Sequence, residues 1–293
     1  MSARSRFRLF KFPVKNQLHR FTRSKFGSFL FFAILISGGL FSVLPLVYCI
    51  TTSFKSLDEL LIFPPTLFTV KRPTIANYTA IPDLLSGLSV PITRYAFNSI
   101  FVSIIGTVLS VIISAMAAFV LSKTEMKFNK LIFTVVQFSL LFNAYTLSVP
   151  QYIVYSKIGI INTYLAYIVP AAASSMGVFL MKQYMDGYVP YALIEAAHID
   201  GAGWIGIFTR IVLPIVRPCV LTLVMFSFLG IWNSVPSGTI FSESLKTLPT
   251  VMSTIAAGGL ARSGSSMATS VILMIFPIAV YLISQGSIKE TMG

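Results

Sequence analysis

Six long runs without a charged residue alternate with more polar segments along the chain. A helix needs about 20 mostly apolar residues to cross a bilayer, and a charge at the bilayer centre costs about 2.5–3.5 kcal/mol on insertion scales. Each run is long enough for one such helix and too short for two. The sequence therefore predicts an all-α polytopic membrane protein with six transmembrane helices, in the runs Phe26–Phe54, Tyr95–Ser122, Leu131–Ser156, Ile158–Met181, Pro218–Ser242 and Ser263–Ile288.

Basic residues are distributed unevenly between these runs. Eight of the 22 Lys and Arg residues lie within residues 1–25, with no acid among them. If this tail, the segments 123–130 and 182–217 and the C-terminus are cytoplasmic, 15 basic residues lie inside and 7 outside. The positive-inside rule therefore predicts that both termini are cytoplasmic. We expect a basic cytoplasmic tail, residues 1–25, followed by one six-helix membrane domain, residues 26–293.

Composition excludes two other classes of protein. The chain is 55% hydrophobic and 11% charged, whereas soluble domains have about 25% charged residues and disordered chains are less apolar. A net charge of +13 in a soluble protein would indicate nucleic-acid binding, but basic residues next to an apolar run are typical of a membrane-flanking tail. The run after Lys25 exceeds the core of about 7–15 residues in a cleaved signal peptide, so we expect a retained helix. Cys49 and Cys219 have apolar surroundings and no CxxC pattern, which predicts packing roles.

The predicted cytoplasmic segment 182–217 contains a short helix-forming run. Pro190 precedes the residues Ala192–His198, and Gly201 and Gly203 follow them, which predicts a helix that ends sharply. Because this helix is short and more polar than the six runs, we do not expect it to span the membrane. It stands between the fourth and fifth predicted spans.

Two side-chain stripes follow from the helical period of this segment. Ala196 and Ala197 lie near Asp200, and Glu195 lies on an adjoining stripe. Small side chains such as these alanines allow another surface to approach closely. The amphipathic pattern by itself also fits an ordinary interfacial helix with a solvated glutamate, so it leaves both interpretations open.

The residue pattern of the segment resembles the EAA loop of bacterial ABC importer permeases. Its matching positions are Glu195, Ala196, Ala197, Asp200, Gly201, Ile211, Leu213 and Pro214. The resemblance extends over most of the chain and is specifically to the carbohydrate-uptake permeases of the maltose-system kind. Weaker matches are Asn77-Tyr78, Asn98-Ser99, Gly159 with Asn162-Thr163-Tyr164, Trp232-Asn233 and Leu248-Pro249.

The resemblance implies a multi-pass permease of the bacterial cell membrane that imports sugars, in particular an oligosaccharide. It implies four kinds of partner: a homologous second permease, two cytoplasmic ATPases, an extracellular sugar-binding protein and membrane lipid. The helix around Glu195 would dock in a groove of an ATPase, and Gly201 would allow the chain to turn away. No GxxxxGK[ST] loop occurs in the chain, so we expect ATP and Mg on the ATPases and no cofactor or enzymatic activity in this subunit.

Polar residues inside the spans are candidates for a sugar path. Ser139, Asn143 and Thr146 are spaced by four and three residues, so they would share one face of a continuous helix. Trp232 and Asn233 in the fifth span are further candidates. Hydrogen bonds between helices and anchoring at the membrane interface are alternative roles for the same residue types.

Outside the membrane, residues 243–267 are rich in Gly and Ser, which predicts an exposed loop. By resemblance, this segment contacts the binding protein. A secondary transporter or channel is the main alternative function, although the six runs contain no Asp, Glu, Lys, Arg or His that could couple ions. A membrane enzyme is a second alternative, but no HExxH, paired carboxylates or Ser/His/Asp set lies near a predicted membrane face.

Overall fold

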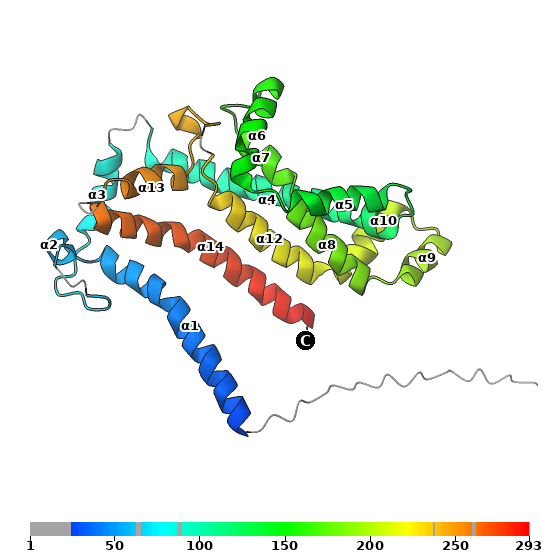
Figure 1. Ribbon diagram of the computed structural model, residues 1–293, viewed down its shortest axis with the longest axis horizontal. Coiled ribbons are helices and arrows are strands. Elements are labelled where there is room, and N and C mark those ends of the chain that lie inside the picture. Colours follow the sequence, from blue (N-terminus) through cyan, green and yellow to red (C-terminus); the bar gives the residue numbers. More distant parts are fainter. Residues whose placement is uncertain (1–24, 63–65, 87–89, 237, 260–261, 293) are drawn as a thin grey trace, which may run out of the picture. The chain divides into compact units, whose positions relative to one another are not determined.

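The computed structural model describes residues 25–62, 66–86, 90–236, 238–259 and 262–292, most of them helical (Figure 1). Among these residues no β-strand occurs, and Lys55 and Pro73 form one isolated antiparallel bridge. The predicted basic tail lies outside the described residues except for Lys25. Backbone contacts divide the chain into two units, residues 1–47 and 48–293.

Helix α1 (Lys25–Ser53) occupies the first apolar run, and most of it belongs to the first unit. Its side chains between Phe26 and Leu46 are largely exposed within the chain, including Phe29 and Leu40. An apolar helix surface of this size requires lipid or another protein to cover it. The first apolar run therefore forms one helix of membrane-spanning length, and its retention stays a prediction.

In the described part of the chain, four helices are long and apolar enough to cross a membrane, and a fifth span results if two helices bent by 83° count as one. The four candidate spans are α1, α4 (Ile92–Lys123), α14 (Ser263–Met292), and α7 (Leu165–Ala172) together with α8 (Ser175–Tyr188) as one span. The bent pair consists of Trp204–Ile215 and Arg217–Trp232. Each of these spans overlaps one of five of the six apolar runs.

The third apolar run, Leu131–Ser156, is divided between two shorter helices. These helices, α5 (Asn129–Ser139) and α6 (Ala144–Ile158), are each shorter than the roughly 20 residues of a membrane span. The carbonyl of Asn143 accepts hydrogen bonds from the amides of Thr146 and Leu147 and so begins α6, a position in which Asn is favoured. Six spans and their orientation thus remain predictions from the sequence.

The remaining helices are short. Those of the predicted outer segments are α2 (Leu57–Leu60), α3 (Ala76–Leu85), the 3₁₀-helix η2 (Glu243–Leu245) and α13 (Leu248–Ala256). Those between the fourth and fifth apolar runs are α9 (Tyr191–Ile199), α10 (Trp204–Ile207), the π-helix η1 (Phe208–Val212) and α11 (Leu213–Ile215), which lead into α12 (Arg217–Trp232).

Helix α4 is the centre of the second unit and packs against α7, α8 and α12. Its buried face carries small residues, namely Ser99, Ser103, Gly106, Thr107, Ser110, Ser114, Ala115 and Ala118. A Cβ at Gly106 would lie 2.9 Å from the end of the Ile231 side chain, so a larger residue would require that side chain of α12 to shift. At 1.5 Å per residue, α4 is about 48 Å long.

Two hydrophobic clusters lie near the two ends of α4. Figure 1 shows the helices that carry them, with α8 and α9 towards one end of α4 and α3 and α13 towards the other. Phe119 near its C-terminal end packs with residues of α8, α9 and α12. Tyr95 near its N-terminal end packs with α3, α13 and α14, and the inward face of α13 presents Val251, Met252 and Ile255. The exposed loop expected at residues 243–267 is therefore wrong for Leu248–Ala256, which form a helix with one buried apolar face, whereas the glycines Gly258 and Gly259 are exposed.

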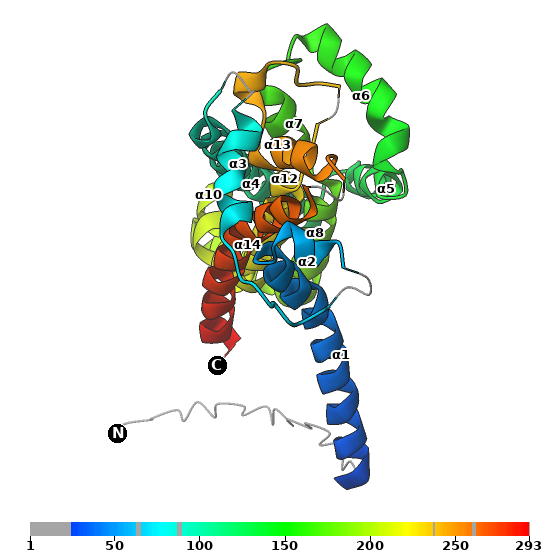
Figure 2. The same cartoon turned by 90° about the vertical axis from the view of Figure 1, so that its left-hand side faces the viewer.

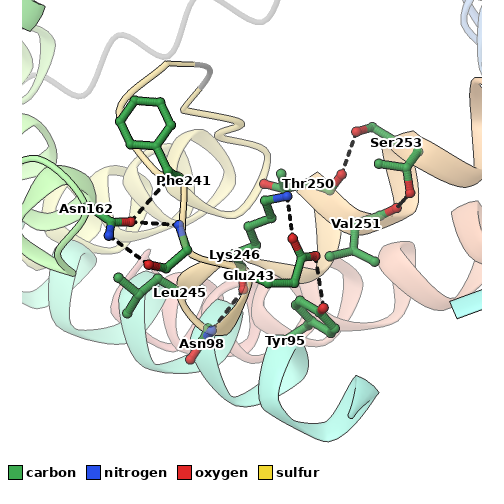
Figure 3. Close-up of polar contacts among 12 residues, drawn as sticks. Tyr95, Asn98, Asn162, Phe241, Glu243, Leu245, Lys246, Thr250, Val251 and Ser253 are labelled. Atoms are coloured by element: carbon green, nitrogen blue, oxygen red, sulfur yellow. Dashed lines mark hydrogen bonds and ion pairs between the residues drawn. The ribbon is translucent and has the colours of Figure 1, made fainter. Parts of the chain in front are cut away.

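Buried polar side chains attach the segment before α13 to α4 (Figure 3). The amide nitrogen of Asn98 donates to the carbonyls of Ser244, at 2.8 Å, and Lys246, at 2.9 Å. The hydroxyl of Tyr95 donates to Glu243 at 3.0 Å, and Lys246 forms an ion pair with the same carboxylate at 2.6 Å. Because the Asn98 bonds are to backbone carbonyls, they fix the path of the chain independently of its side chains.

The turn between the third and fourth runs contributes a second attachment. Gly159 and Asn162 have positive φ, 72° and 58°, as residues of tight turns often do. The Asn162 side chain accepts hydrogen bonds from the amides of Phe241 and Ser242 and donates to the Ser242 hydroxyl at 2.7 Å. The turn therefore holds the chain that leads into η2.

Replacing Asn98 by Ala should destabilise this outer region. We expect the free energy of unfolding to fall by about 1–3 kcal/mol, because two backbone carbonyls and the hydroxyl of Tyr164, which donates to Asn98 at 2.7 Å, lose the buried Asn98 side chain as their partner. Denaturant unfolding of the purified chain in detergent measures the change. The matched control is Asn233→Ala, at an exposed residue, for which we expect less than about 0.5 kcal/mol. Equal losses would contradict the role assigned to Asn98.

Candidate functional site

The short helix expected after Pro190 is present as α9, and its two ends have defined caps. Pro190 has extended backbone angles and stands at the N-cap. At the other end, the amide of Gly201 donates to the carbonyl of His198, and the amide of Ala202 donates to the carbonyl of Ala197, both at 3.0 Å. Gly201 has a φ of +80°. This is the Schellman arrangement, which favours glycine and ends the helix abruptly.

The two faces of α9 meet different environments. Ile194 and Ala197 are buried against the cluster around Phe119, whereas Glu195 and Ala196 are exposed. The interpretation that both alanines offer a small-residue surface to a partner is therefore wrong for Ala197. Its methyl group instead allows α9 to lie close to the chain's own core. Glu195 and Ala196 belong to the face that is open to another molecule.

The exposed side of α9 also continues into apolar surface. Ile199 is 86% exposed and Ile205, on α10, is 81% exposed. Between them, the ring of Trp204 lies 4.4 Å from that of His198 and 6.1 Å from that of Phe119, centroid to centroid. Apolar side chains this exposed at a polar helix end are typical of a protein-binding surface.

The last three matching positions lie at the bend that leads from α10 into α12. Ile211 is in the π-helix η1, and Leu213 and Pro214 begin α11. Proline lacks the amide needed for a regular helical bond, and a π-turn is one way to accommodate the lost bond. Ile211 and Leu213 pack on the cluster around Phe119, and Pro214 is exposed. These residues therefore shape the bend of 83°.

Asp200 stands at the C-cap of α9 and is exposed. Close to the other end of the helix, burial raises the pKa of the Tyr191 phenol, and the carboxylates of Glu125, Asp186 and Glu195 raise it further. Tyr191 is therefore neutral at physiological pH. Its ring faces the ammonium group of Lys123, 5.5 Å from the ring centroid, an attractive arrangement.

A cavity of about 670 Å³ lies among α4, α6, α7, α8 and α12. Figure 2 shows α6 standing apart from the helices around α4, and three side chains of α6 contribute to the lining. No charged side chain belongs to the described lining. Its hydroxyl and amide groups include those of Ser110, Gln151, Tyr155, Ser174, Ser227 and Thr239. A lining of this size and chemistry suits a small polar, uncharged molecule.

Three residues expected to line a sugar path lie outside the described lining of this cavity. Ser139, Asn143 and Thr146 do not share a helix face, because α5 ends at Ser139 and α6 begins after Asn143. Ser139 donates to the Ser175 hydroxyl at 2.7 Å, a bond between helices. None of the three belongs to the described lining of the cavity.

The other two sugar-path candidates, Trp232 and Asn233 at the end of α12, make packing and capping contacts. Trp232 is buried, and its ring packs on Phe228 and Phe276 with centroids 5.7 Å and 5.0 Å away. Asn233 is exposed at the C-cap and donates to the carbonyl of Leu229 at 2.9 Å. The lining residues of α12 lie on another face, where Ser227 and Gly230 point into the cavity. The small-residue spacing of Ser227 and Gly230 could have indicated this face.

Among the described residues, no three His, Cys, Asp or Glu side chains lie close enough together to hold a metal ion. The two cysteines are free. The two features of the second unit that suit a function are therefore the exposed face of α9 and the cavity. Helices of membrane-spanning length around a polar-lined cavity are compatible with a membrane transport protein.

Comparison with known proteins places the chain within this class. It is 33% identical over 207 residues to the protein LplC of Bacillus subtilis, a match that covers 68% of this chain and 65% of LplC, slightly less than two thirds. It is 31% identical over 222 residues to the arabinooligosaccharides transport system permease protein AraQ of Halalkalibacterium halodurans, covering 73% of this chain and 76% of AraQ. No protein-family model matches the chain.

The fold is also similar to that of a solved structure. The chain superposes with a TM-score of 0.71 on a chain of a bacterial ABC transporter involved in the import of the acidic polysaccharide alginate, with 18% identity, over 90% of this chain and 98% of the other. The chain therefore belongs to the carbohydrate-uptake family of bacterial ABC importer permeases. It lies in the bacterial cytoplasmic membrane.

Replacing Gly201 by Ala tests the cap of α9. We expect the local turn to be strained by about 1–2 kcal/mol, because the left-handed backbone is unfavourable for a residue with a Cβ. Thermal unfolding of the purified permease should show the loss. Gly203→Ala is the matched control, since Gly203 has a φ of −75° and neither glycine has a heavy atom within 4 Å of the added Cβ. A comparable loss in both variants would exclude the backbone explanation.

Proposed function

We propose that this chain is the permease subunit of an ATP-driven sugar importer and that α9 couples it to the ATPases. The single observation that carries the coupling proposal is the placement of Glu195 and Ala196 on the exposed face of a capped helix. Family membership supports transport, and the sugar oligomers in the names of relatives such as AraQ support an oligosaccharide as the cargo.

In this proposal an ATPase receives the exposed face of α9 in a groove. Glu195 pairs with a basic residue of the ATPase, and Ile199 and Ile205 supply apolar contact around it. Gly201 turns the chain back towards the bend near Pro214. Closure of two ATPases would then move α9 as a lever and reorient the spans. ATP and Mg are bound by the ATPases, and this chain holds no cofactor.

The proposed topology is six spans with both termini in the cytoplasm. It is supported by the separation of α9 and α13 at opposite ends of α4 (Figure 1), because the first belongs to a predicted cytoplasmic segment and the second to a predicted outer segment. In this topology α5 and α6 together form the third span, and the bent pair ending in α12 forms the fifth.

The cavity is the proposed sugar path through this subunit. Its hydroxyl and amide groups can exchange hydrogen bonds with sugar hydroxyls, and the absence of charge in its described lining favours a neutral sugar. A homologous second permease would close the open side near α6 and supply the remaining contacts. An extracellular sugar-binding protein would deliver the sugar at the end that carries α13.

Glu195→Ala should weaken docking of the ATPases, because the exposed carboxylate is the proposed partner of a basic residue. We expect co-purification of the ATPases with the permease and ATP-dependent sugar uptake to fall about tenfold, which corresponds to about 1.4 kcal/mol. Glu125→Ala, which removes another exposed acid of the predicted cytoplasmic side, should leave both unchanged. Normal docking in the Glu195 variant would exclude α9 as the proposed lever.

Gly230→Phe should block the cavity. Gly230 lines it, and no heavy atom lies within 4 Å of an added Cβ, so the phenyl ring can extend into the open space. We expect sugar uptake in proteoliposomes to fall at least tenfold while the ATPases still bind. Gly39→Phe, at an exposed helical glycine of α1 with equally open surroundings, should transport normally. Unchanged uptake by the Gly230 variant would show that the sugar takes another route.

A further inference from the structure

A buried lysine connects α4 to the start of α9. Lys123 is the last residue of α4 and only 4% exposed. Its ammonium group donates to the carbonyl of Val189 at 2.7 Å and faces the ring of Tyr191. Val189 is the C-cap of α8 and Tyr191 is the first residue of α9. Lys123 therefore contacts both sides of the elbow formed by Val189 and Pro190.

The lysine supplies a hydrogen-bond donor to the backbone carbonyl of Val189 at the C-terminal end of α8. The last carbonyls of an α-helix lack intrahelical donors and carry partial negative charge, so a cation is stabilising there. Pro190 cannot donate a hydrogen bond to a neighbouring group because it has no amide hydrogen. The lysine thus neutralises the end of α8 at the point where the chain turns into α9.

Two other charged groups near the elbow, Lys182 and Asp186, are engaged with one another. Asp186 forms an ion pair with Lys182 at 2.6 Å and accepts a hydrogen bond from Ser122 at 2.5 Å. Among the described residues, Lys123 forms no ion pair with a carboxylate. The buried ammonium therefore depends on the Val189 carbonyl and the Tyr191 ring. Separating α9 from α4 would take the ring of Tyr191 away from the ammonium group and leave only its hydrogen bond to the Val189 carbonyl at the end of α8.

Helix α4 extends from this contact to the cavity. Ser110 lies 13 residues before Lys123, about 20 Å along the helix. Its hydroxyl lies 3.2 Å from that of Ser227 on α12, and both residues line the cavity. Between these points the buried face of α4 packs closely against α8 and α12. A displacement of the C-terminal end of α4 is therefore carried to the cavity by a packed, continuous helix.

We infer that Lys123 is a positioning residue that makes α9 and the C-terminal end of α4 move as one body, so that ATPase movement at α9 reaches the cavity. This inference rests on the proposed function of α9. Docking itself is proposed to depend on Glu195, which lies one turn after Tyr191 and forms no bond with Lys123 among the described residues. Loss of Lys123 should therefore uncouple ATP hydrolysis from transport without releasing the ATPases.

The test uses the complete importer, this chain with its second permease and ATPases, in proteoliposomes. In Lys123→Met we expect the sugar transported per ATP hydrolysed to fall at least fivefold while ATPase binding stays within twofold of the parent. Lys123→Arg, which keeps a charged donor, should restore the ratio to within twofold. Lys127→Met, at an exposed lysine of the following loop, is the matched control and should leave the ratio unchanged.

A distance measurement separates coupling from general destabilisation. Spin labels at the exposed residues Met116 on α4 and Ala192 on α9, in a chain without Cys49 and Cys219, report the separation of the two helices. With Lys123 present, the distance should stay constant between the nucleotide-free and ATP-bound complexes. With Lys123→Met it should change or broaden on ATP binding.

Two outcomes would overturn the inference. The first is an unchanged transport ratio and a constant distance in Lys123→Met. The second is loss of ATPase binding in parallel with transport, without rescue by Lys123→Arg, which would indicate a purely structural role. Glu195→Ala distinguishes these from failure of the proposed function: if that variant binds the ATPases normally, α9 is not the docking helix, whereas impaired docking with an unchanged Lys123→Met ratio overturns only the role of Lys123.

Discussion

Three helices can surround α4 because its buried face is made of small side chains. Gly106 leaves room for the Ile231 side chain of α12. On another neighbour, α8, a Cβ added to Gly177 would lie 2.4 Å from the hydroxyl of Ser114. Inside a bilayer, apolar side chains gain little from leaving lipid for protein, so helices associate through close contact and polar groups. The packing of α7, α8 and α12 on one face of α4 thus defines both the cavity and the relation between its two ends.

Side-chain bonds to backbone carbonyls attach both ends of α4 to the segments beside them. At one end Asn98 binds the carbonyls of Ser244 and Lys246, and at the other Lys123 binds the carbonyl of Val189. The donor side chains, Asn98 and Lys123, are both buried, so loss of these bonds would leave a buried polar group without a partner. This arrangement links the outer helix α13 and the exposed helix α9 to one rigid element without requiring particular side chains at the carbonyl positions.

Local sequence rules predicted the elements whose causes are local. The apolar runs predicted helices because the cost of a charge in a bilayer depends on the residue itself. Pro190 and Gly201 predicted the ends of α9, since an extended proline and a left-handed glycine are backbone properties. The break before α6 was missed, although Asn143 is a residue type that often begins helices. The helical face assumed for Ser139 and Thr146 failed with it.

The sequence by itself determined that the chain is a helical membrane protein, and it identified the motif on α9 that indicates an ABC importer permease. Only the tertiary structure decided which side of each helix meets the rest of the chain. In that structure Ala197 is buried and Glu195 is exposed. Trp232 is buried against aromatic rings, whereas Ser227 and Gly230 line the cavity. The reason is physical: small and polar residues serve equally well as packing or lining groups, and only the position of neighbouring helices distinguishes the two roles.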